Sequence, residues 1–259
     1  MKQLLSIIFI TISSISIAQK STELSRSKSD NAKQAVTASK RFVFVINNNT
    51  IEKRNKVTWE KVAEKNFPKL HHLNSSVIIN NKIYCAHSNY PEIPMHSSIE
   101  IFDTKTLSHI ESHSFGIENG SCTWIDKVGK YYYVFFAHYA NANKMQKNRD
   151  VSWSQLVKYD ENWSRVAGWV LPRELLERVS PYSISGGIFL NKHQILATHH
   201  HHKEFYLLSI PKMNSELILE KIIPTTIRGQ GISYDNKNHN IIWGINKKTQ
   251  EVIKVKLED

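Results

Sequence analysis

The sequence predicts an all-β fold made of repeated four-stranded units, and three observations support this prediction. A short apolar segment that ends on a polar residue returns five times along the chain. Each copy follows a turn rich in Asn, Gly, Asp or Lys, and another short strand-like segment precedes that turn. A further strand-like segment comes after each copy. Three strands therefore recur in a fixed order, as consecutive antiparallel neighbours.

The first strand of each unit is predicted at residues 34–39, 74–79, 121–126, 185–190 and 230–235. The second is predicted at 42–47, 83–87, 133–138, 195–199 and 241–246. The third is predicted at 50–55, 98–103, 154–160, 204–210 and 251–257. A fourth strand is visible in four units, at 59–68, 107–116, 163–172 and 217–225. A short helix is predicted only at 172–180, where Pro172 can occupy the first position.

A four-stranded antiparallel unit of about 40 to 60 residues has the size of one propeller blade. The five units predict a single five-bladed β-propeller over residues 31–259, with a six-bladed ring as the alternative if the long loops hide another unit. The fifth unit lacks its outermost strand. Residues 19–30 either supply that strand or form a disordered tail, since their Ser and Lys content suits both.

Residues 1–18 have the features of a secretory signal peptide, with an early lysine, an apolar segment and the small residue Ala18 at the cleavage point. No cysteine follows directly, and no later segment is apolar enough to span a bilayer. We therefore expect an exported protein, periplasmic or secreted, that has no membrane span. Its oligomeric state is not set by the sequence, and we favour a monomer.

The chain is basic, with 34 Lys and Arg against 23 Asp and Glu and a formal net charge of +11. Such a field favours acidic partners. The basic residues are scattered singly through turns and form no recognisable nucleic-acid-binding motif, so nucleic acid is not an expected partner. Cys85 and Cys122 lie in apolar strand segments and either pair or remain free and buried.

The order of strands in a blade predicts a site. If the innermost strand leads, the start of strand one and the end of strand two lie on the same face, near the axis. The five starts are Gln34, Asn74, Ser121, Ser185 and Gln230, and the five ends are Asn47, His87, His138, His199 and Asn246. Asn is a common turn residue, and we interpret the two Asn ends in that way. Histidine is not, so the three His ends predict ligand-facing groups.

Long loops strengthen this prediction. Residues 87–98 and 138–154 are the two longest connections and both join strand two to strand three, on the same face. The predicted ligand-binding residues of this face are His72, Asn74, Asn89, Tyr90, Glu118, Tyr139, Tyr182 and Gln230. A rim rich in aromatic and amide groups, with Arg228 nearby, suits a carbohydrate or another small hydroxylated or anionic ligand.

Three interpretations of the ring remain open. His87, His138 and His199 could bind a divalent metal such as Zn, Mn or Ca. Alternatively, His87 or His138 could be a catalytic acid or base while Arg228 holds a carboxylate, which suits a lyase, a cyclase, or a lactone or glycan hydrolase. The ring could also only bind a small carbohydrate or carboxylate, which is the interpretation we prefer.

A run of four histidines occupies residues 199–202. Alternate side chains of a strand point to opposite faces, so all four cannot serve one ion. The repeat register assigns His199 to the ring, and His201 is the next candidate.

The segment 72–116, with "NGSCTW" at 119–124 and "SGG" at 185–187, resembles a family of exported bacterial β-propeller proteins of no settled activity. The phrase "IEIFDTKTL" at 99–107 is more loosely similar to NHL, YncE and quinoprotein-type propellers. The first resemblance extends over nearly all of the mature chain, and the second is only a blade pattern. Both imply the fold, and neither implies a reaction.

Overall fold

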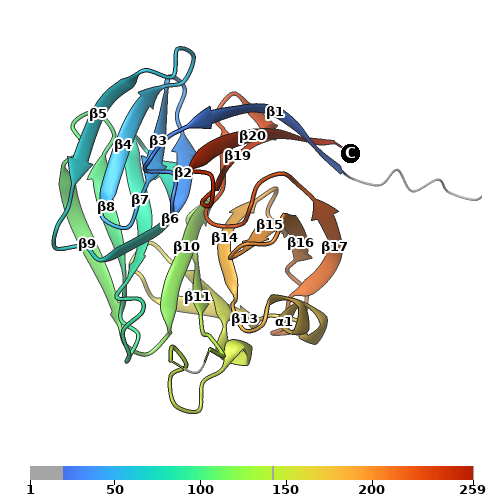
Figure 1. Ribbon diagram of the computed structural model, residues 1–259. Coiled ribbons are helices and arrows are strands. Elements are labelled where there is room, and N and C mark those ends of the chain that lie inside the picture. The colour runs from blue at the N-terminus through green and yellow to red at the C-terminus, as the bar shows by residue number, and fades with distance from the viewer. Residues whose placement is uncertain (1–19, 142, 259) are drawn as a thin grey trace, which may run out of the picture.

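The computed structural model describes residues 20–141 and 143–258, so the predicted signal peptide at residues 1–18 lies outside the described residues. The described chain forms five four-stranded antiparallel sheets arranged in a ring (Figure 1). The prediction of an all-β, five-bladed propeller is confirmed, and no sixth blade is formed by the described residues.

The first blade consists of β2 (Ala35–Ala38), β3 (Phe42–Ile46), β4 (Thr50–Asn55) and β5 (Lys61–Asn66). The second consists of β6 (His72–Ile79), β7 (Lys82–Ser88), β8 (Ser97–Asp103) and β9 (His109–Gly116). The third consists of β10 (Ser121–Val128), β11 (Tyr131–Ala137), β12 (Gln155–Tyr159) and β13 (Arg165–Val170). The fourth consists of β14 (Ile184–Phe189), β15 (Gln194–His199), β16 (Glu204–Ser209) and β17 (Ile218–Pro224). The fifth consists of β18 (Ser233–Asp235), β19 (Asn238–Asn246), β20 (Glu251–Glu258) and β1 (Lys20–Lys28).

The turns explain why neighbouring strands pair. Ile79 faces Lys82 across the β6–β7 hairpin, which leaves Asn80 and Asn81 as its two loop residues. Both have positive φ angles, of 49° and 61°. Two-residue hairpin loops need such angles to match the twist of the strands, and Asn tolerates them better than most residues.

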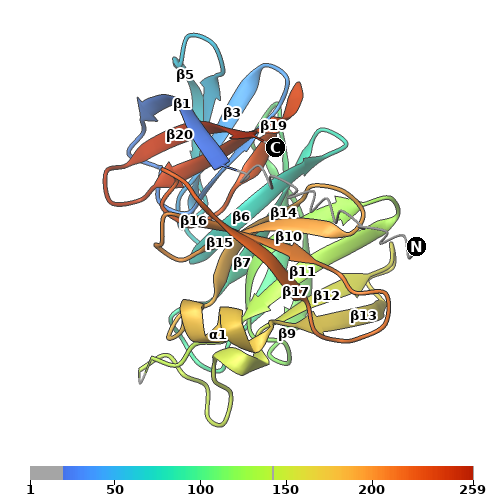
Figure 2. The same ribbon diagram turned by 90° about the vertical axis from the view of Figure 1, so that its right-hand side faces the viewer.

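The N-terminal segment closes the ring. β1 pairs antiparallel with β20, from Lys20 opposite Glu258 to Lys28 opposite Glu251, and Figure 2 shows the two strands side by side. Arg26 adds an ion pair to Glu251 at 2.9 Å. Residues 20–28 therefore supply the outermost strand of the fifth blade instead of forming a disordered tail.

The blades pack through apolar side chains between their sheets. Trp124 of the third blade stacks on Phe135, with ring centroids 5.9 Å apart, and meets Phe189 of the fourth blade edge-on. Cys85 and Cys122 are buried in such layers as free thiols. Burial raises the pKa of the Cys85 thiol, so it stays protonated.

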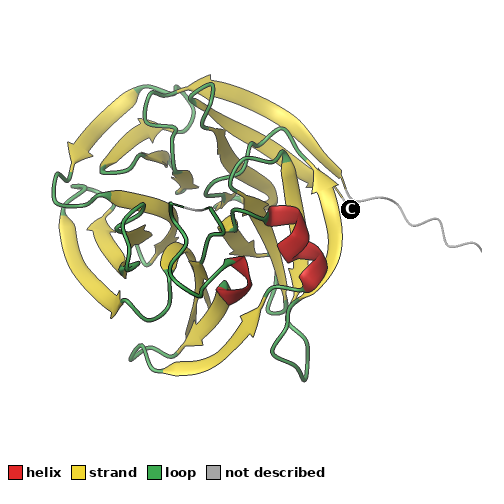
Figure 3. Ribbon diagram, turned by 60° about the horizontal axis from the view of Figure 1, so that its bottom comes forward, coloured by secondary structure: helices red, strands yellow, loops and turns green. Residues whose placement is uncertain are grey.

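Two short helices accompany the strands, η1 (Val151–Trp153) and α1 (Arg173–Val179). α1 lies inside the predicted helical segment, with Pro172 at its N-cap, and it buries Leu175 and Val179. Figure 3 shows both helices among the loops of one face of the ring. In the described part of the chain, no helix has the length and hydropathy needed to cross a membrane.

Candidate functional site

A cavity of about 540 Å³ opens between the first, second and fifth blades, on the face where second strands lead into third strands. We term it the mouth cavity. Three of the predicted ligand-binding residues, His72, Asn89 and Tyr90, are among the residues that line it. The complete lining is Gln34, Asn48, His71, His72, Asn89, Tyr90, Pro91, Glu92 and Lys247.

Tyr90 forms an aromatic wall of the mouth cavity. Its ring centroid lies 4.9 Å from that of His72 and 5.3 Å from that of Tyr139. Tyr139 is buried, and this burial raises the pKa of its hydroxyl group. Tyr139 therefore supports the wall from behind, and Tyr90 presents its ring to the cavity.

Asn89 holds the loop that carries Tyr90. The backbone N–H of His96 donates to Asn89 Oδ1 at 2.8 Å, and Asn89 Nδ2 donates to the carbonyl oxygen of Pro94 at 3.0 Å. The backbone N–H of Glu92 also donates to the carbonyl oxygen of Asn89, at 3.0 Å. Because its side chain is engaged within the loop, Asn89 positions the wall more than it offers a free amide.

Lysine side chains make the mouth cavity electropositive. Lys247 lines the cavity, while the amine of Lys144 hydrogen-bonds the Tyr90 hydroxyl and lies 4.6 Å from the ring centroid. Desolvation lowers the pKa of Lys247, and repulsion from Lys144 and Lys33 adds to this effect. Glu92 is the one carboxylate among the lining residues. This balance favours an anionic ligand.

Two imidazoles at the mouth are neutral near pH 7. Burial, followed by repulsion from Lys247, lowers the pKa of His72 to about 3 and that of His200 to about 3. Gln230 Nε2 donates to the carbonyl oxygen of His200 at 2.8 Å. Tyr182 stacks on the His200 ring, with centroids 4.8 Å apart. The predicted residues Tyr182 and Gln230 thus surround a histidine that the strand-end register does not select.

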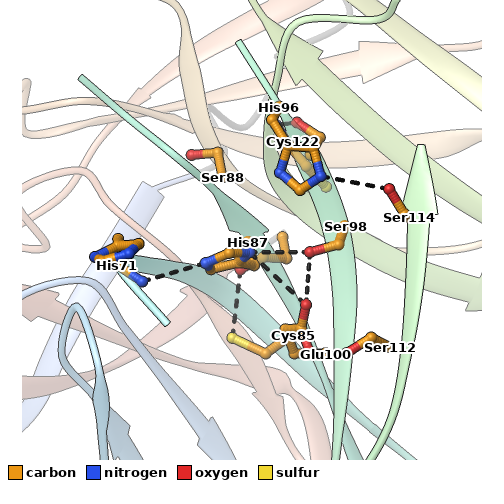
Figure 4. Close-up of polar contacts among 12 residues, drawn as sticks. His71, Cys85, His87, Ser88, His96, Ser98, Glu100, Ser112, Ser114 and Cys122 are labelled. Atoms are coloured by element: carbon orange, nitrogen blue, oxygen red, sulfur yellow. Dashed lines mark hydrogen bonds and ion pairs between the residues drawn. The ribbon is translucent and has the colours of Figure 1, made fainter. Parts of the chain in front are cut away.

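His87 is 6% exposed and lies beside His71, Ser98 and Glu100 (Figure 4). Ser98 Oγ donates to Glu100 Oε1 at 2.6 Å, so in the 2.9 Å contact between His87 Nδ1 and Ser98 Oγ the imidazole is the donor. His87 Nε2 accepts the backbone N–H of His71 at 3.3 Å. Because His71 lines the mouth cavity, His87 positions the cavity wall from within the second blade.

Glu100 is a buried carboxylate on β8 that the strand-end register also does not select. Ser112 Oγ donates to Glu100 Oε2 at 2.5 Å, and His109 Nε2 lies 2.7 Å from the same oxygen. Burial opposes ionisation, but the hydrogen bonds from Ser112, Ser98 and His109 lower the pKa of Glu100 overall. Burial lowers the pKa of His87 to about 4, although attraction to Glu100 counteracts it.

His138 is 1% exposed and is not among the residues that line the mouth cavity. The loop before β10 covers it, since a Cβ added to Gly120 would lie 2.6 Å from His138 Nε2. No described residue hydrogen-bonds its Nδ1. Burial lowers the pKa of His138 to about 4, and repulsion from Arg149 contributes. His138 is therefore a neutral imidazole packed inside the third blade.

The histidine run folds into a turn around His199. The backbone N–H groups of His201 and His202 donate to His199 Nδ1 at 3.2 and 3.1 Å. His199 Nε2 lies 3.1 Å from the carbonyl oxygen of Val179 and donates to it. Both ring nitrogens are thus engaged, and burial lowers the pKa of His199 to about 3.

The structure does not bring His87, His138 and His199 together as one metal-binding group. Among the described residues, the group whose potential ligand atoms lie within 4.8 Å of one another is His199, His201 and His202. The strand register correctly places side chains on one face, but it does not say where they point. Buried imidazoles need hydrogen-bond partners, and those of His87 and His199 lie close to their own strand ends.

The strand-end asparagines serve the scaffold. Asn74 Nδ2 donates to the carbonyl oxygen of Cys122 at 2.8 Å and so joins the second blade to the third. Asn47 Oδ1 accepts the N–H of the next residue at 2.8 Å, and Asn246 Oδ1 accepts an N–H two residues on at 3.1 Å. These contacts fit the interpretation of Asn47 and Asn246 as turn residues.

Glu118 and Arg228 lie outside the mouth cavity. Glu118 is exposed, and its carbonyl oxygen accepts a hydrogen bond from Arg149 at 2.9 Å. Arg228 belongs to a second cavity of about 680 Å³, which we term the Arg228 cleft. The cleft is lined by Arg178, His201, His202, Lys203, Glu204 and Arg228. Consequently, the three predicted catalytic residues His87, His138 and Arg228 do not share one cavity.

Comparison with known proteins supports the fold alone. No protein-family model matches the chain, and no curated protein matches it. Among solved structures, the chain is similar to the WD40 repeats of RRP9, with a TM-score of 0.50 and 10% identity over 86% of this chain and 79% of that chain. It is also similar to a chain of the mitotic checkpoint complex, with a TM-score of 0.49 and 10% identity over 100% and 99% of the two chains. The likeness to RRP9 shows a β-propeller and carries no ligand or reaction to this chain.

Proposed function

We propose that this protein is an exported β-propeller that binds a small hydroxylated, anionic ligand, such as a carbohydrate acid, at the mouth cavity. The observation that carries the proposal is an aromatic wall beside two lysines in a cavity lined by a single carboxylate. The ring of Tyr90 offers apolar surface to a sugar ring, and Lys144 and Lys247 attract its acidic group.

Export is supported by residues 1–18, which carry the features of a signal peptide and lie outside the described residues. β1 begins at Lys20, just after the expected cleavage point at Ala18. Cleavage there would leave the closing strand of the fifth blade complete, so a signal peptide is compatible with the propeller.

Catalysis at the same face has less support. His87 is buried behind the cavity wall and His138 is buried in the third blade, and burial lowers both pKa values to about 4. Such imidazoles are weak bases and are not in contact with the cavity. Arg228 lines a different cleft. Binding is therefore the function that the geometry favours, with a lyase, cyclase or hydrolase as the alternative.

A divalent metal such as Zn, Mn or Ca fits the histidines poorly. His199 is the most buried member of the group of three, and both of its ring nitrogens are engaged in hydrogen bonds. Ligation would need to break at least one of these contacts. Two histidines without a third protein ligand make a weak site.

Calorimetric titration of untagged protein with galacturonic acid oligomers tests the proposal. Lys247→Gln should weaken binding about tenfold, because hydrogen bonds to charged groups contribute about 1.5–3 kcal/mol each. Lys40→Gln is the matched control, since Lys40 is exposed in the β2–β3 turn on the opposite face. Two outcomes would contradict an anionic ligand at the mouth cavity. One is an affinity for neutral galactose oligomers equal to that for galacturonic acid oligomers, and the other is an equal loss of affinity in Lys247→Gln and Lys40→Gln.

A further inference from the structure

The Arg228 cleft gathers more positive than negative charge. Its lining contains three basic side chains, Arg178, Lys203 and Arg228, against the single carboxylate Glu204. Two imidazoles, of His201 and His202, complete it. None of these residues lines the mouth cavity, so the cleft is a separate feature of the same face.

The carboxylate of the cleft, that of Glu204, is already paired with an arginine of the protein. Arg178 binds Glu204 through two hydrogen bonds, of 2.9 and 2.5 Å, and the Tyr206 hydroxyl donates to the same carboxylate at 3.1 Å. A bidentate arginine satisfies both oxygens of a carboxylate. Glu204 therefore leaves the charges of Arg228 and Lys203 uncompensated.

A second carboxylate near the cleft, that of Glu23, is also paired with an arginine. Glu23 on β1 interacts with Lys203 at long range, but Arg26 binds it at 3.0 and 2.8 Å. Within residues 20–141 and 143–258, no carboxylate lies within the 4.0 Å ion-pair distance of Arg228 or Lys203. Two cations thus face the cleft without a protein partner.

The backbone that carries Arg228 is tightly fixed against the histidine turn. The N–H of Arg228 donates to the carbonyl oxygen of Ile245 at 3.0 Å, and the N–H of Gln230 donates to that of His199 at 3.0 Å. Gly229, between them, has a φ of 65°, and a Cβ there would lie 2.2 Å from the His199 carbonyl oxygen. Only glycine fits this approach, so the sequence places Arg228 beside His201 and His202 at a defined position.

The chemistry of the cleft favours an anion over a cation. A metal ion would meet two uncompensated cations and would need a nitrogen of His199 that is already hydrogen-bonded. An oxyanion instead finds the planar fork of Arg228, the point charge of Lys203 and imidazole N–H donors. Forked guanidinium groups bind carboxylate, sulfate and phosphate oxygens in pairs.

We propose that the Arg228 cleft is a second binding site, which takes an oxyanion group of the sulfate, phosphate or carboxylate type. The site uses Arg228 and Lys203 for charge and His201 and His202 as hydrogen-bonding neighbours. It is independent of the mouth cavity and its proposed ligand.

Nuclear magnetic resonance of the histidine side chains tests this site directly. Untagged protein is titrated with sodium sulfate, sodium phosphate or sodium acetate, with sodium chloride holding the ionic strength constant. We expect saturable shifts of the His201 and His202 signals, and the ranking of the three salts distinguishes a tetrahedral from a planar oxyanion. Shifts that stay linear and match those with chloride alone would overturn the proposal.

Variants locate the binding within the cleft. Arg228→Gln should raise the dissociation constant about tenfold, and Lys203→Gln, at an exposed side chain, about threefold. Arg41→Gln is the matched control, because Arg41 is exposed in the β2–β3 turn of the opposite face. Lys247→Gln should leave this titration unchanged, which separates the cleft from the mouth cavity. If the dissociation constant of the oxyanion is unchanged in both Arg228→Gln and Lys203→Gln, the proposed site is refuted.

Discussion

Asp126 is a buried carboxylate that ties the third blade to the fourth. Its Oδ2 accepts the backbone N–H of Phe189 at 2.8 Å, and its Oδ1 accepts that of Lys127 at 2.7 Å. Burial nevertheless raises the pKa of Asp126 to about 6. An aspartate of the unfolded chain has a pKa of about 3.9, so the folded chain holds this proton more tightly and loses stability when the group ionises.

Asp126→Asn should therefore change how stability depends on pH. As pH rises from 4 to 7, wild type accumulates the cost of ionising Asp126, and the variant does not. The free energy of unfolding of the variant should gain about 2 kcal/mol relative to wild type over this interval. Denaturant unfolding at each pH measures it. A constant difference between the two proteins would show that Asp126 titrates normally.

Alanine substitutions at two glycines can distinguish the cost of backbone strain from the cost of steric crowding. Gly229 and Gly116 have nearly equal φ angles, of 65° and 64°, but an added Cβ meets the His199 carbonyl oxygen at 2.2 Å in the first case and nothing within 4 Å in the second. Gly116→Ala should cost about 1 kcal/mol, the strain of a left-handed alanine. Gly229→Ala should cost at least about 2 kcal/mol more and weaken oxyanion binding at Arg228. Equal melting temperatures for the two variants would contradict the close approach.

Single residues of the site were predicted where the strand order alone decides their place. His72, Asn89 and Tyr90 follow from loop position, since these loops can only lie on one face. His200 could not be selected, because it lies in the turn after β15, one residue beyond the strand end that the repeat register selects. Glu100 could not be predicted as a site residue, because a repeat of apolar segments does not indicate which side chains form hydrogen bonds between neighbouring strands of a blade.

At the scale of elements, alternation and turn residues were sufficient for nearly every strand. The β1 strand was the exception that stayed open. Its pairing with β20 depends on backbone hydrogen bonds, and its side chains are mostly exposed, as in the segment "KSTELSRSK". A Ser- and Lys-rich edge strand and a disordered tail share this composition, and only the presence of the unpaired β20 edge decides between them.

Deletion of residues 20–28 should destabilise the propeller by on the order of 4 kcal/mol or more, since eight residue pairs with β20 are lost. Thermal unfolding measures the loss. A synthetic peptide of residues 20–28 should restore the melting temperature by adding a strand to the open edge, and a scrambled peptide should not. An unchanged melting temperature after the deletion would mean that β1 does not hold the ring closed.

Within the described part of the chain, burial lowers the pKa values of five histidines to about 4 or below. The group consists of His72, His87, His138, His199 and His200, and their pKa values are lowered to between about 3 and about 4. Unfolded histidine has a pKa of about 6.5. Below that pH the unfolded chain binds protons that the folded chain excludes, so stability is lost as pH falls from 6.5 towards 4.

The melting temperature should therefore drop by at least about 10 °C between pH 7 and pH 5. Ionisation of Asp126 opposes the trend but involves one group against five. His138→Gln should reduce the change of melting temperature with pH by about one fifth. His193→Gln is the control and should leave this change as it is in wild type, because His193 is exposed in the β14–β15 turn. A melting temperature that is flat over this range would contradict neutral, buried imidazoles.

The seam between β1 and β20 joins the first described strand of the chain to the last. All the other blades are complete within their own stretch of sequence, and they can form in order as synthesis proceeds. β1 leaves the ribosome before the other described strands, and it must wait for β20, which follows them. A polypeptide that is threaded through a membrane pore in an extended state would thus keep its ring open until β20 emerges on the far side.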